Sequence, residues 1–192
     1  MKYLKEFREC FKNLPSFTVR DALLFLVKKG STKEYAYLFL HNLLEKNELK
    51  RITKGVYTFK EETQVVGLAF QPYYYGLQDA LSLQDAWEQE TNPLVITPRK
   101  VRTGVRNFLG NNYVVRRIDR KMFFGFHAMK YGDFWINVSD LEKTLIDFAY
   151  FREPLAKEAI EEIKPKLDKI KLSEYLEKSP KRVKELVRRF QA

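Results

Sequence analysis

The sequence predicts an α+β protein in which an N-terminal winged helix-turn-helix precedes a second α+β domain that ends in helices. Two observations lead to this prediction. In residues 1–60, three segments with the apolar spacing of helices precede a short alternating stretch with a basic turn. In residues 61–192, strand-like and helix-like segments follow one another. We therefore expect two domains, 1–60 and 61–192, joined near Glu61-Glu62.

The composition is that of a basic globular protein. The 192 residues include 35 Lys+Arg against 25 Asp+Glu, for a net charge of +10, and 45% are hydrophobic, which is enough to form a core. No apolar run approaches the ~18–20 residues of a membrane span, and the first residues lack the apolar segment of a signal peptide. Cys10 is the single cysteine, so no intramolecular disulfide can form. We expect a soluble, cytoplasmic protein with no membrane partner.

Three helices are predicted in the first domain. Apolar residues at helical spacing mark residues 2–13 and 19–29, and a third helix opens at Ser31-Thr32. The second helix begins with a capping box, because Asp21 follows Thr18 by three residues. The stripes expected to form the core are Ala22, Leu23, Leu26 and Val27 on the second helix, and Ala36, Leu40, Leu43 and Leu44 on the third.

The third helix and the hairpin after it carry candidate DNA-binding groups. Residues 49–52 and 56–59 alternate around the turn Thr53-Lys54-Gly55, which predicts the hairpin. In a winged helix-turn-helix, the third helix enters the major groove, and cations on the hairpin, or wing, neutralise phosphates. Asn can pair with adenine, and hydroxyl groups bind bases or phosphates. The candidate contacts are Thr32, Lys33, Tyr35, His41 and Asn42 on the helix, and Lys50, Arg51 and Lys54 on the wing.

A second basic block lies in the second domain. Residues 97–132 carry nine Lys or Arg and one Asp, whereas residues 61–96 carry six acids and no Lys or Arg. The block could extend a phosphate-binding surface, bind an acidic protein surface, or be a solvated rim. Its candidate residues are Arg99, Lys100, Arg102, Arg106, Arg116, Arg117, Arg120 and Lys121.

Strands and helices are predicted to alternate in residues 61–192. Residues 72–76 read as an aromatic turn, in which we expect the tyrosines to be packing residues. Ser139 and Glu142 form a predicted capping box at the start of a helix. The predicted strands are residues 64–70, 94–97, 113–115, 126–130 and 134–138; the other helices are residues 79–87 and most of the chain from residue 155.

No catalytic, metal or cofactor site is predicted. A metal nuclease places an acid before Asp/Glu-x-Lys on a strand, whereas Glu142 directly precedes Lys143 in a predicted helix, and Asp147 suits an i,i+4 pair with Lys143. His41 and His127 are too few and too far apart for a metal site. No glycine-rich phosphate loop occurs. The carboxylates considered were Asp79, Asp85, Glu88, Asp133, Asp140, Glu142 and Asp147. We expect a protein that is not an enzyme.

Several short motifs lead to a family resemblance. Residues 17–21 (Phe-Thr-Val-Arg-Asp) and 49–57 (Leu-Lys-Arg-Ile-Thr-Lys-Gly-Val-Tyr) resemble the winged helix of AbiEi-type antitoxins, the regulators of type IV toxin–antitoxin (abortive infection) pairs. Residues 73–81, 124–125 and 138–147 resemble that family's tyrosine-rich turn, Phe-Gly block and Glu-Lys-Thr-Leu block. The departures are Asn47 in place of a helix-ending Gly, and Gly76 and Asp79 in place of serines.

The resemblance implies a transcriptional regulator with two partners. One is double-stranded operator DNA, with inverted repeats in its own promoter, which the protein would repress. The other is a nucleotidyltransferase-like toxin, which it would counteract without a stable complex. The residues leave an alternative open, a protein-interaction adaptor whose winged helix and basic block bind an acidic protein. The oligomeric state also stays open.

Overall fold

The computed structural model describes residues 1–87 and 91–191, and the chain divides into two compact units. Unit 1 comprises Met1–Ala69 together with Phe108–Asn111, and unit 2 comprises Phe70–Asn107 and Asn112–Ala192. The predicted join near Glu61-Glu62 falls inside unit 1. The α+β class predicted from the sequence is confirmed. No helix in the described part of the chain has the length and apolarity needed to cross a membrane.

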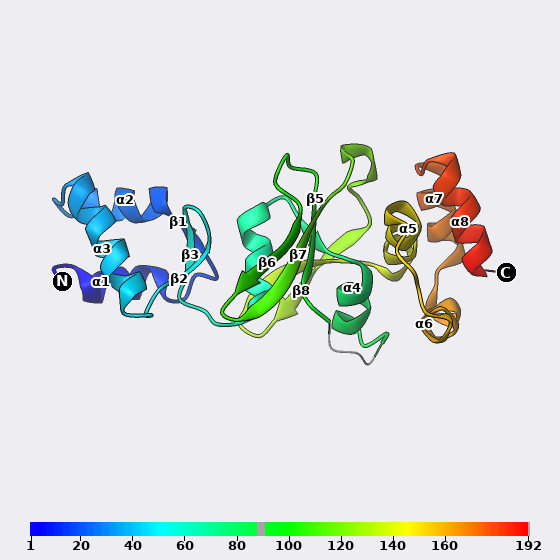
Figure 1. Ribbon diagram of the computed structural model, residues 1–192, viewed down its shortest axis with the longest axis horizontal. Coiled ribbons are helices and arrows are strands. Elements are labelled where there is room, and N and C mark those ends of the chain that lie inside the picture. The colour runs from blue at the N-terminus through cyan, green and yellow to red at the C-terminus, as the bar shows by residue number, and fades with distance from the viewer. Residues whose placement is uncertain (88–90, 192) are drawn as a thin grey trace. The chain divides into compact units, whose positions relative to one another are not determined.

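Unit 1 packs three helices and a small sheet around an aromatic core (Figure 1). The helices are α1 (Leu4–Phe11), α2 (Val19–Lys28) and α3 (Lys33–Glu45). The strands are β1 (Phe17–Thr18), β2 (Lys50–Thr53) and β3 (Val56–Thr58), in the order β1-β3-β2 with antiparallel pairs. The pairing of β1 with β3 was not predicted. The centroid of the Phe7 ring lies 4.6–6.2 Å from the centroids of five other phenylalanine rings. These ring contacts hold the helices against the sheet.

The predicted start of α2 and end of α3 are both present. The Thr18 side chain accepts the backbone N–H of Asp21, and the Asp21 carboxylate accepts the N–H of Thr18 at 2.8 Å, which completes the capping box. Asn47 follows α3 with a left-handed φ of 54°, a conformation that Asn tolerates better than most residues.

The predicted core stripes of α2 and α3 are partly wrong. Val27 is exposed and Leu44 is only half-buried. In α3 the buried residues are Ala36, Phe39, Leu40 and Leu43. They follow the spacing i, i+3, i+4 and i+7, which places Phe39 in the core and moves Leu44 to the edge of the stripe.

Unit 2 is built on a six-stranded mixed sheet in the order β6-β7-β5-β4-β9-β8. β5 is parallel to β7, β4 is parallel to β9 but antiparallel to β5, and β8 and β9 form the predicted hairpin. The strand β6 was not predicted. The bounds are β4 (Tyr74–Tyr75), β5 (Leu94–Thr97), β6 (Gly104–Phe108), β7 (Asn111–Arg117), β8 (Phe126–Tyr131) and β9 (Phe134–Ser139).

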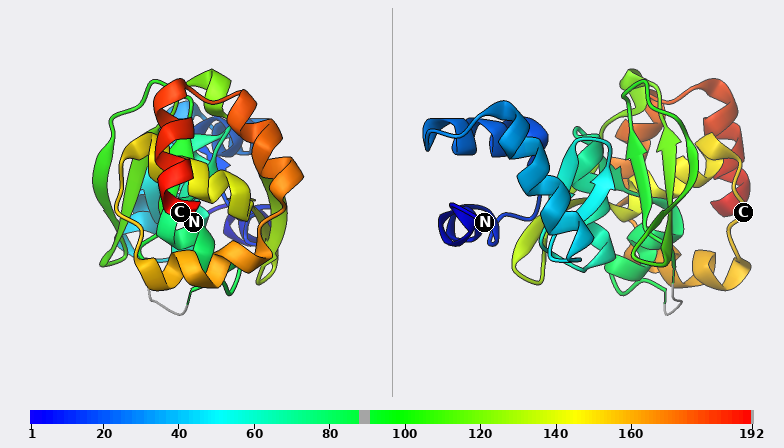
Figure 2. Two further views of the ribbon diagram at one scale, coloured as in Figure 1. Left: turned by 90° about the vertical axis from the view of Figure 1, so that its right-hand side faces the viewer. Right: turned by 60° about the vertical axis from the view of Figure 1, so that its left-hand side comes forward.

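Helices of unit 2 cover one face of this sheet, as Figure 2 shows for the C-terminal helices. Their apolar residues meet β4 and β5 in one core cluster, in which Ile146, Phe148, Val183 and Val187 are fully buried. The helices are α4 (Leu77–Leu83), α5 (Leu141–Phe151), α6 (Lys157–Ile163), α7 (Lys169–Glu177) and α8 (Lys181–Gln191), with short 3₁₀ segments η2 (Arg120–Met122) and η3 (Lys164–Lys166).

Two predictions for residues 64–76 are wrong. The predicted strand over residues 64–70 is a 3₁₀ helix, η1 (Thr63–Phe70). A short apolar run without alternation fits a buried helix as well as a strand, and Val65 and Val66 are both fully buried. The aromatic turn contains β4, a strand between β5 and β9. All three tyrosines, 73–75, are buried, so their role as packing residues is confirmed.

The predicted capping box at Ser139 is also wrong. The N-cap of α5 is Asp140, whose carboxylate accepts the Lys143 N–H at 2.8 Å. Ser139 is the last residue of β9, because that strand runs one residue further than predicted, and its hydroxyl contacts the Tyr75 carbonyl at 3.3 Å. Glu142 instead accepts the N–H of Asp168 at 2.8 Å and so ties α5 to the start of α7.

Candidate nucleic-acid interface

The first turn of α3 presents an exposed hydroxyl and an exposed ammonium group. Thr32 is the N-cap, and its Oγ1 accepts the Tyr35 N–H at 3.2 Å. The Glu34 backbone N–H and the Thr32 hydroxyl both donate to the Glu34 carboxylate, which lowers the pKa of Glu34. Lys33 is exposed beside it. Because a helix N-terminus favours negative charge, the Glu34 carboxylate is the anion that this turn already holds, and Lys33 is the group left to contact a phosphate.

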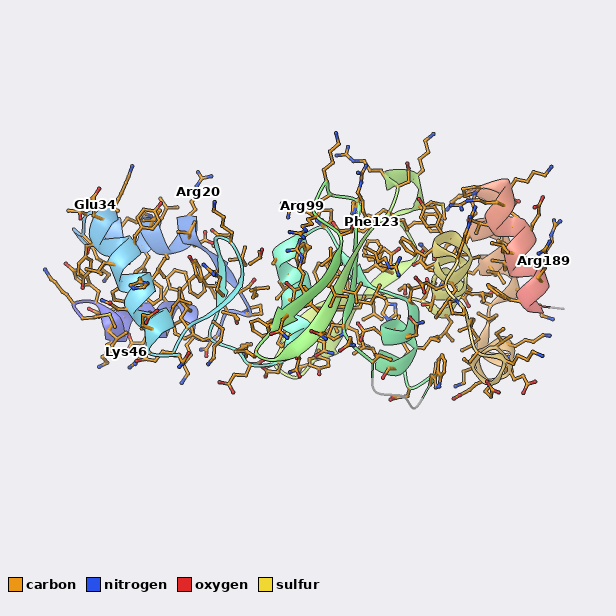
Figure 3. The ribbon with its side chains drawn as sticks, in the orientation of Figure 1. Arg20, Glu34, Lys46, Arg99, Phe123 and Arg189 are labelled. Carbon is orange, nitrogen blue, oxygen red and sulfur yellow. The ribbon has the colours of Figure 1, made fainter. Side chains whose placement is uncertain are left out.

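A row of exposed side chains follows along α3, on the side opposite its buried stripe. Glu34, Leu38, His41 and Glu45 are exposed, and Tyr37 lies exposed at the edge of this row. Figure 3 labels Glu34 and Lys46 at the two ends of the helix. The exposed fractions of Tyr37 and Leu38 are 55% and 54%. Tyr37 was not among the predicted contacts, although a helical wheel places it about 100° from the centre of the buried stripe.

Two of the predicted α3 contacts lie at the side of this row. Tyr35 is half-buried, its ring lies 6.2 Å from that of Phe39, and its hydroxyl donates to the Lys2 carbonyl at 3.2 Å. Its phenol therefore serves the packing of unit 1, which leaves it poorly placed for DNA. Asn42 is half-buried, and His41 is exposed.

The hairpin β2–β3 carries two exposed cations and one that is paired. Lys50 Nζ lies 2.8 Å from Glu61 Oε1, and its side chain is only 14% exposed. The hydrogen bond from Lys50 and its charge lower the pKa of Glu61, so the two charges offset one another. Arg51 and Lys54 are exposed and form no ion pair within the described residues. This hairpin therefore offers Arg51 and Lys54, rather than Lys50, to an anion.

In unit 2, five residues of the basic block meet at one edge of the sheet. Since β5 and β7 are parallel, with Thr97 beside Arg117, their carboxyl ends lie at the same edge. Arg99, labelled in Figure 3, and Lys100 follow β5, and η2 follows β7. We call this set the basic edge. It consists of Arg99, Lys100, Arg117, Arg120 and Lys121, all of which are exposed.

Two other residues of the block are engaged inside unit 2. Arg106 donates to the Arg102 carbonyl at 2.7 Å, and its guanidinium carbon lies 5.0 Å from the centre of the Phe70 ring. Arg116 forms an ion pair with Glu153 and lies over the Phe151 ring at 5.7 Å. Successive strand residues point to opposite faces, so Arg116 and Arg117 cannot belong to one surface. Arg102 is exposed between β5 and β6.

The predicted pair of Lys143 and Asp147 is present and fully buried. The Tyr74 hydroxyl donates to Asp147 at 2.9 Å, and the Lys143 ammonium lies 5.3 Å from the Tyr74 ring and 5.2 Å from the Phe124 ring. Burial raises the pKa of Asp147 and lowers the pKa of Lys143. Because both side chains have no exposed surface, we assign this pair to the core of unit 2 rather than to a reactive site.

The remaining carboxylates that the structure describes do not assemble into a metal site. Asp79 is buried and accepts the Leu94 N–H at 3.0 Å, and burial raises its pKa to about 7. Asp140 accepts the Tyr175 hydroxyl at 2.9 Å and pairs with Lys171. Glu88 lies outside the described residues. Within those residues, no group of three or more His, Cys, Asp or Glu side chains could hold a metal ion.

No protein-family model matches the chain, and no curated protein sequence matches it.

Proposed function

We propose that the protein is a DNA-binding transcriptional regulator in which unit 1 is a winged helix and α3 is its recognition helix. The observation that carries the proposal is the arrangement around α3. The exposed Lys33 at the start of the helix is followed by a row of exposed side chains that lie opposite its buried stripe. The order of three helices and a β2–β3 hairpin is that of a winged helix-turn-helix.

The basic edge of unit 2 supports the same proposal. Five exposed cations at one edge of a sheet form a surface of the kind that binds a phosphate backbone. We therefore assign the basic edge to additional, sequence-independent DNA contacts. We do not assign Arg106 and Arg116 to that surface, because both guanidinium groups pack on aromatic rings of unit 2.

We extend the proposal to the biological role on the resemblance to AbiEi-type antitoxins. On that basis the protein represses its own promoter and counteracts a nucleotidyltransferase-like toxin. The motifs that carry the resemblance include Gly125 and residues 138–147, where the structure shows close packing. A Cβ at Gly125 would lie 2.8 Å from both Lys143 and the Tyr175 ring. Co-expression with the neighbouring toxin-like gene, if there is one, tests this role through rescue of growth.

The test of DNA binding is a fluorescence-anisotropy titration of the full-length protein. The duplexes are the DNA upstream of its own gene and a scrambled control, each at two salt concentrations. A preference for the upstream DNA of ~10³-fold or more supports an operator-reading regulator. The variant Asn42→Ala should reduce that preference, whereas Lys33→Ala should weaken binding to both duplexes alike, because it removes a phosphate contact. Binding that is equal on both duplexes and disappears with salt would reject the proposal.

A second candidate function, a protein-interaction adaptor, is favoured by the exposed apolar residues of unit 1. Leu24 and Val27 on α2 are 52% and 43% exposed, in addition to Tyr37 and Leu38 on α3. Exposed apolar groups of this size are suited to a protein interface. This function would be favoured over the first if one protein bound tightly and saturably. That protein should also displace DNA that is bound weakly and without sequence preference.

A further inference from the structure

The structure places a leucine at the centre of the row of exposed side chains on α3. Leu38 is 54% exposed, and its neighbours one turn away are Glu34, Tyr35, His41 and Asn42. A leucine side chain cannot bind a phosphate group, and its exposure costs free energy in the unbound protein. A partner that meets α3 at this position must therefore offer an apolar group there.

The charges around Leu38 indicate whether this residue faces the phosphate backbone of DNA or the edges of its bases. Surfaces that face phosphates are rich in Lys and Arg. Beside Leu38, His41 and Asn42 can accept or donate hydrogen bonds, whereas the Glu34 carboxylate is held by Thr32. Cations flank α3 only at its ends, at Lys33 and Lys46. The major-groove edges of the bases present acceptors, donors and one apolar group, the 5-methyl group of thymine. The centre of α3 matches that mixture.

We propose that Leu38 contacts the 5-methyl group of a thymine, so that the operator holds an A·T pair opposite the middle of α3. The inference rests on the proposed function, because it requires α3 to lie in the major groove. It names a residue that sets base preference and the base that this residue selects. Tyr37, which is equally exposed beside it, enlarges the apolar surface.

A second leucine in unit 1 provides a matched control. Leu24 on α2 is 52% exposed, almost the same as Leu38. Its neighbours one turn away include the cations Arg20 and Lys28, both exposed, and Figure 3 shows the Arg20 side chain extending away from α2. Those surroundings fit a phosphate backbone, which carries no methyl group. The two leucines therefore share residue type and exposure but differ in the part of DNA they are expected to meet.

The experiment removes single methyl groups from the DNA. A preferred duplex is first selected from a random library with the full-length protein, and each thymine in it is then replaced, one at a time, by deoxyuridine. Affinities are measured by anisotropy for wild type, Leu38→Ala and Leu24→Ala. We expect one position at which uracil weakens wild-type binding about fourfold, the loss expected for one methyl group. Leu38→Ala should lose this sensitivity, and Leu24→Ala should retain it.

The outcomes separate this inference from the proposed function. A selected sequence whose binding is unchanged by uracil at every position, or whose sensitivity survives in Leu38→Ala, overturns the inference and leaves the regulator intact. A library that yields no preferred sequence overturns the proposed function first. Equal losses from Leu24→Ala and Leu38→Ala, on thymine and uracil duplexes alike, would show that neither leucine distinguishes the methyl group and would also overturn the inference. Circular dichroism of the variants verifies that both remain folded.

Discussion

The helices α3 and α5 depart from the usual helix pattern in opposite ways. In α3, the apolar side chains Tyr37 and Leu38 are more than half exposed. In α5, the charged side chains Glu142, Lys143 and Asp147 are at most 4% exposed. The usual amphipathic helix does neither.

The exposed apolar residues of α3 and the buried charges of α5 have different functional consequences. The exposed residues of α3 have no role in packing unit 1, so they are available to a partner. The buried charges of α5 already have their partners inside unit 2, namely each other, Tyr74, Lys171 and the start of α7. We therefore expect changes in α5 to act on stability and changes in α3 to act on binding.

The largest effect is expected from Asp147→Ala. The change leaves Lys143 buried and unpaired, which should lower the free energy of unfolding by about 3–5 kcal/mol. Urea unfolding followed by circular dichroism measures this loss. The double variant Lys143→Met/Asp147→Leu removes both charges and should recover most of the stability. A loss below about 1 kcal/mol in Asp147→Ala would mean that the pair is hydrated, which contradicts the assignment to the core.

Asp79→Asn should change how stability depends on pH. The raised pKa means that folded Asp79 keeps its proton up to about pH 7, whereas the unfolded chain loses it near pH 3.8. The folded state therefore binds more protons between these values, and its stability falls as the pH rises through that window. At about 1.4 kcal/mol per pKa unit, the Asp79 contribution to that fall is roughly 4 kcal/mol.

The asparagine side chain in this variant would keep an oxygen acceptor for the Leu94 N–H without a titrating proton. We therefore expect the variant to lack this fall and to match or exceed the wild-type stability at pH 8. Unfolding free energies at pH 4, 6 and 8 test the prediction through the difference between the two proteins, because the other carboxylates titrate in both. Parallel pH curves for the two proteins would show that Asp79 is ionised throughout.

Gly125→Ala tests the packing between α5 and α7. Gly125 has a φ of +71°, and a Cβ there would lie 2.8 Å from the Lys143 Cβ and the Tyr175 ring. Backbone strain and overpacking together should cost about 2–4 kcal/mol. Gly132 is a matched control, because its φ is also positive at +56° and nothing lies within 4 Å. Gly132→Ala should cost only the strain of about 1–2 kcal/mol, so equal losses in thermal unfolding would show that packing contributes nothing at Gly125.

Local patterns were predictable from the sequence wherever one segment determines the outcome. The Thr18–Asp21 capping box and the Lys143–Asp147 spacing both depend on residues within one turn, and both are present. The hairpin β8–β9 was also predictable, because its strands are adjacent in sequence around Gly132. Such features need no knowledge of the rest of the fold.

Features that depend on distant segments could not be predicted. Residues 74–75 form a strand because β5 and β9, far away in the sequence, lie on either side. Lys143 and Asp147 are buried because aromatic rings and the C-terminal helices cover them, which their spacing cannot show. On α3, spacing alone could not show that Tyr35 is half-buried while Tyr37 is exposed, because the chain at Lys2, far away in the sequence, contacts Tyr35.

The smallest effect is expected from Arg117→Ala, which we compare with Arg116→Ala at the neighbouring position of β7. Arg117 belongs to the exposed basic edge, whereas Arg116 pairs with Glu153 on the other face of the sheet. If the basic edge contacts phosphates, Arg117→Ala should reduce the slope of log affinity against log salt by about 0.9 and leave stability unchanged. Arg116→Ala should leave the slope unchanged and cost about 0.5–1 kcal/mol of stability, because its ion pair is partly exposed. Equal slopes for the two variants and the wild type in anisotropy titrations would remove the basic edge from the DNA interface. Sequence-independent contacts would then have to come from Arg51, Lys54 and the first turn of α3.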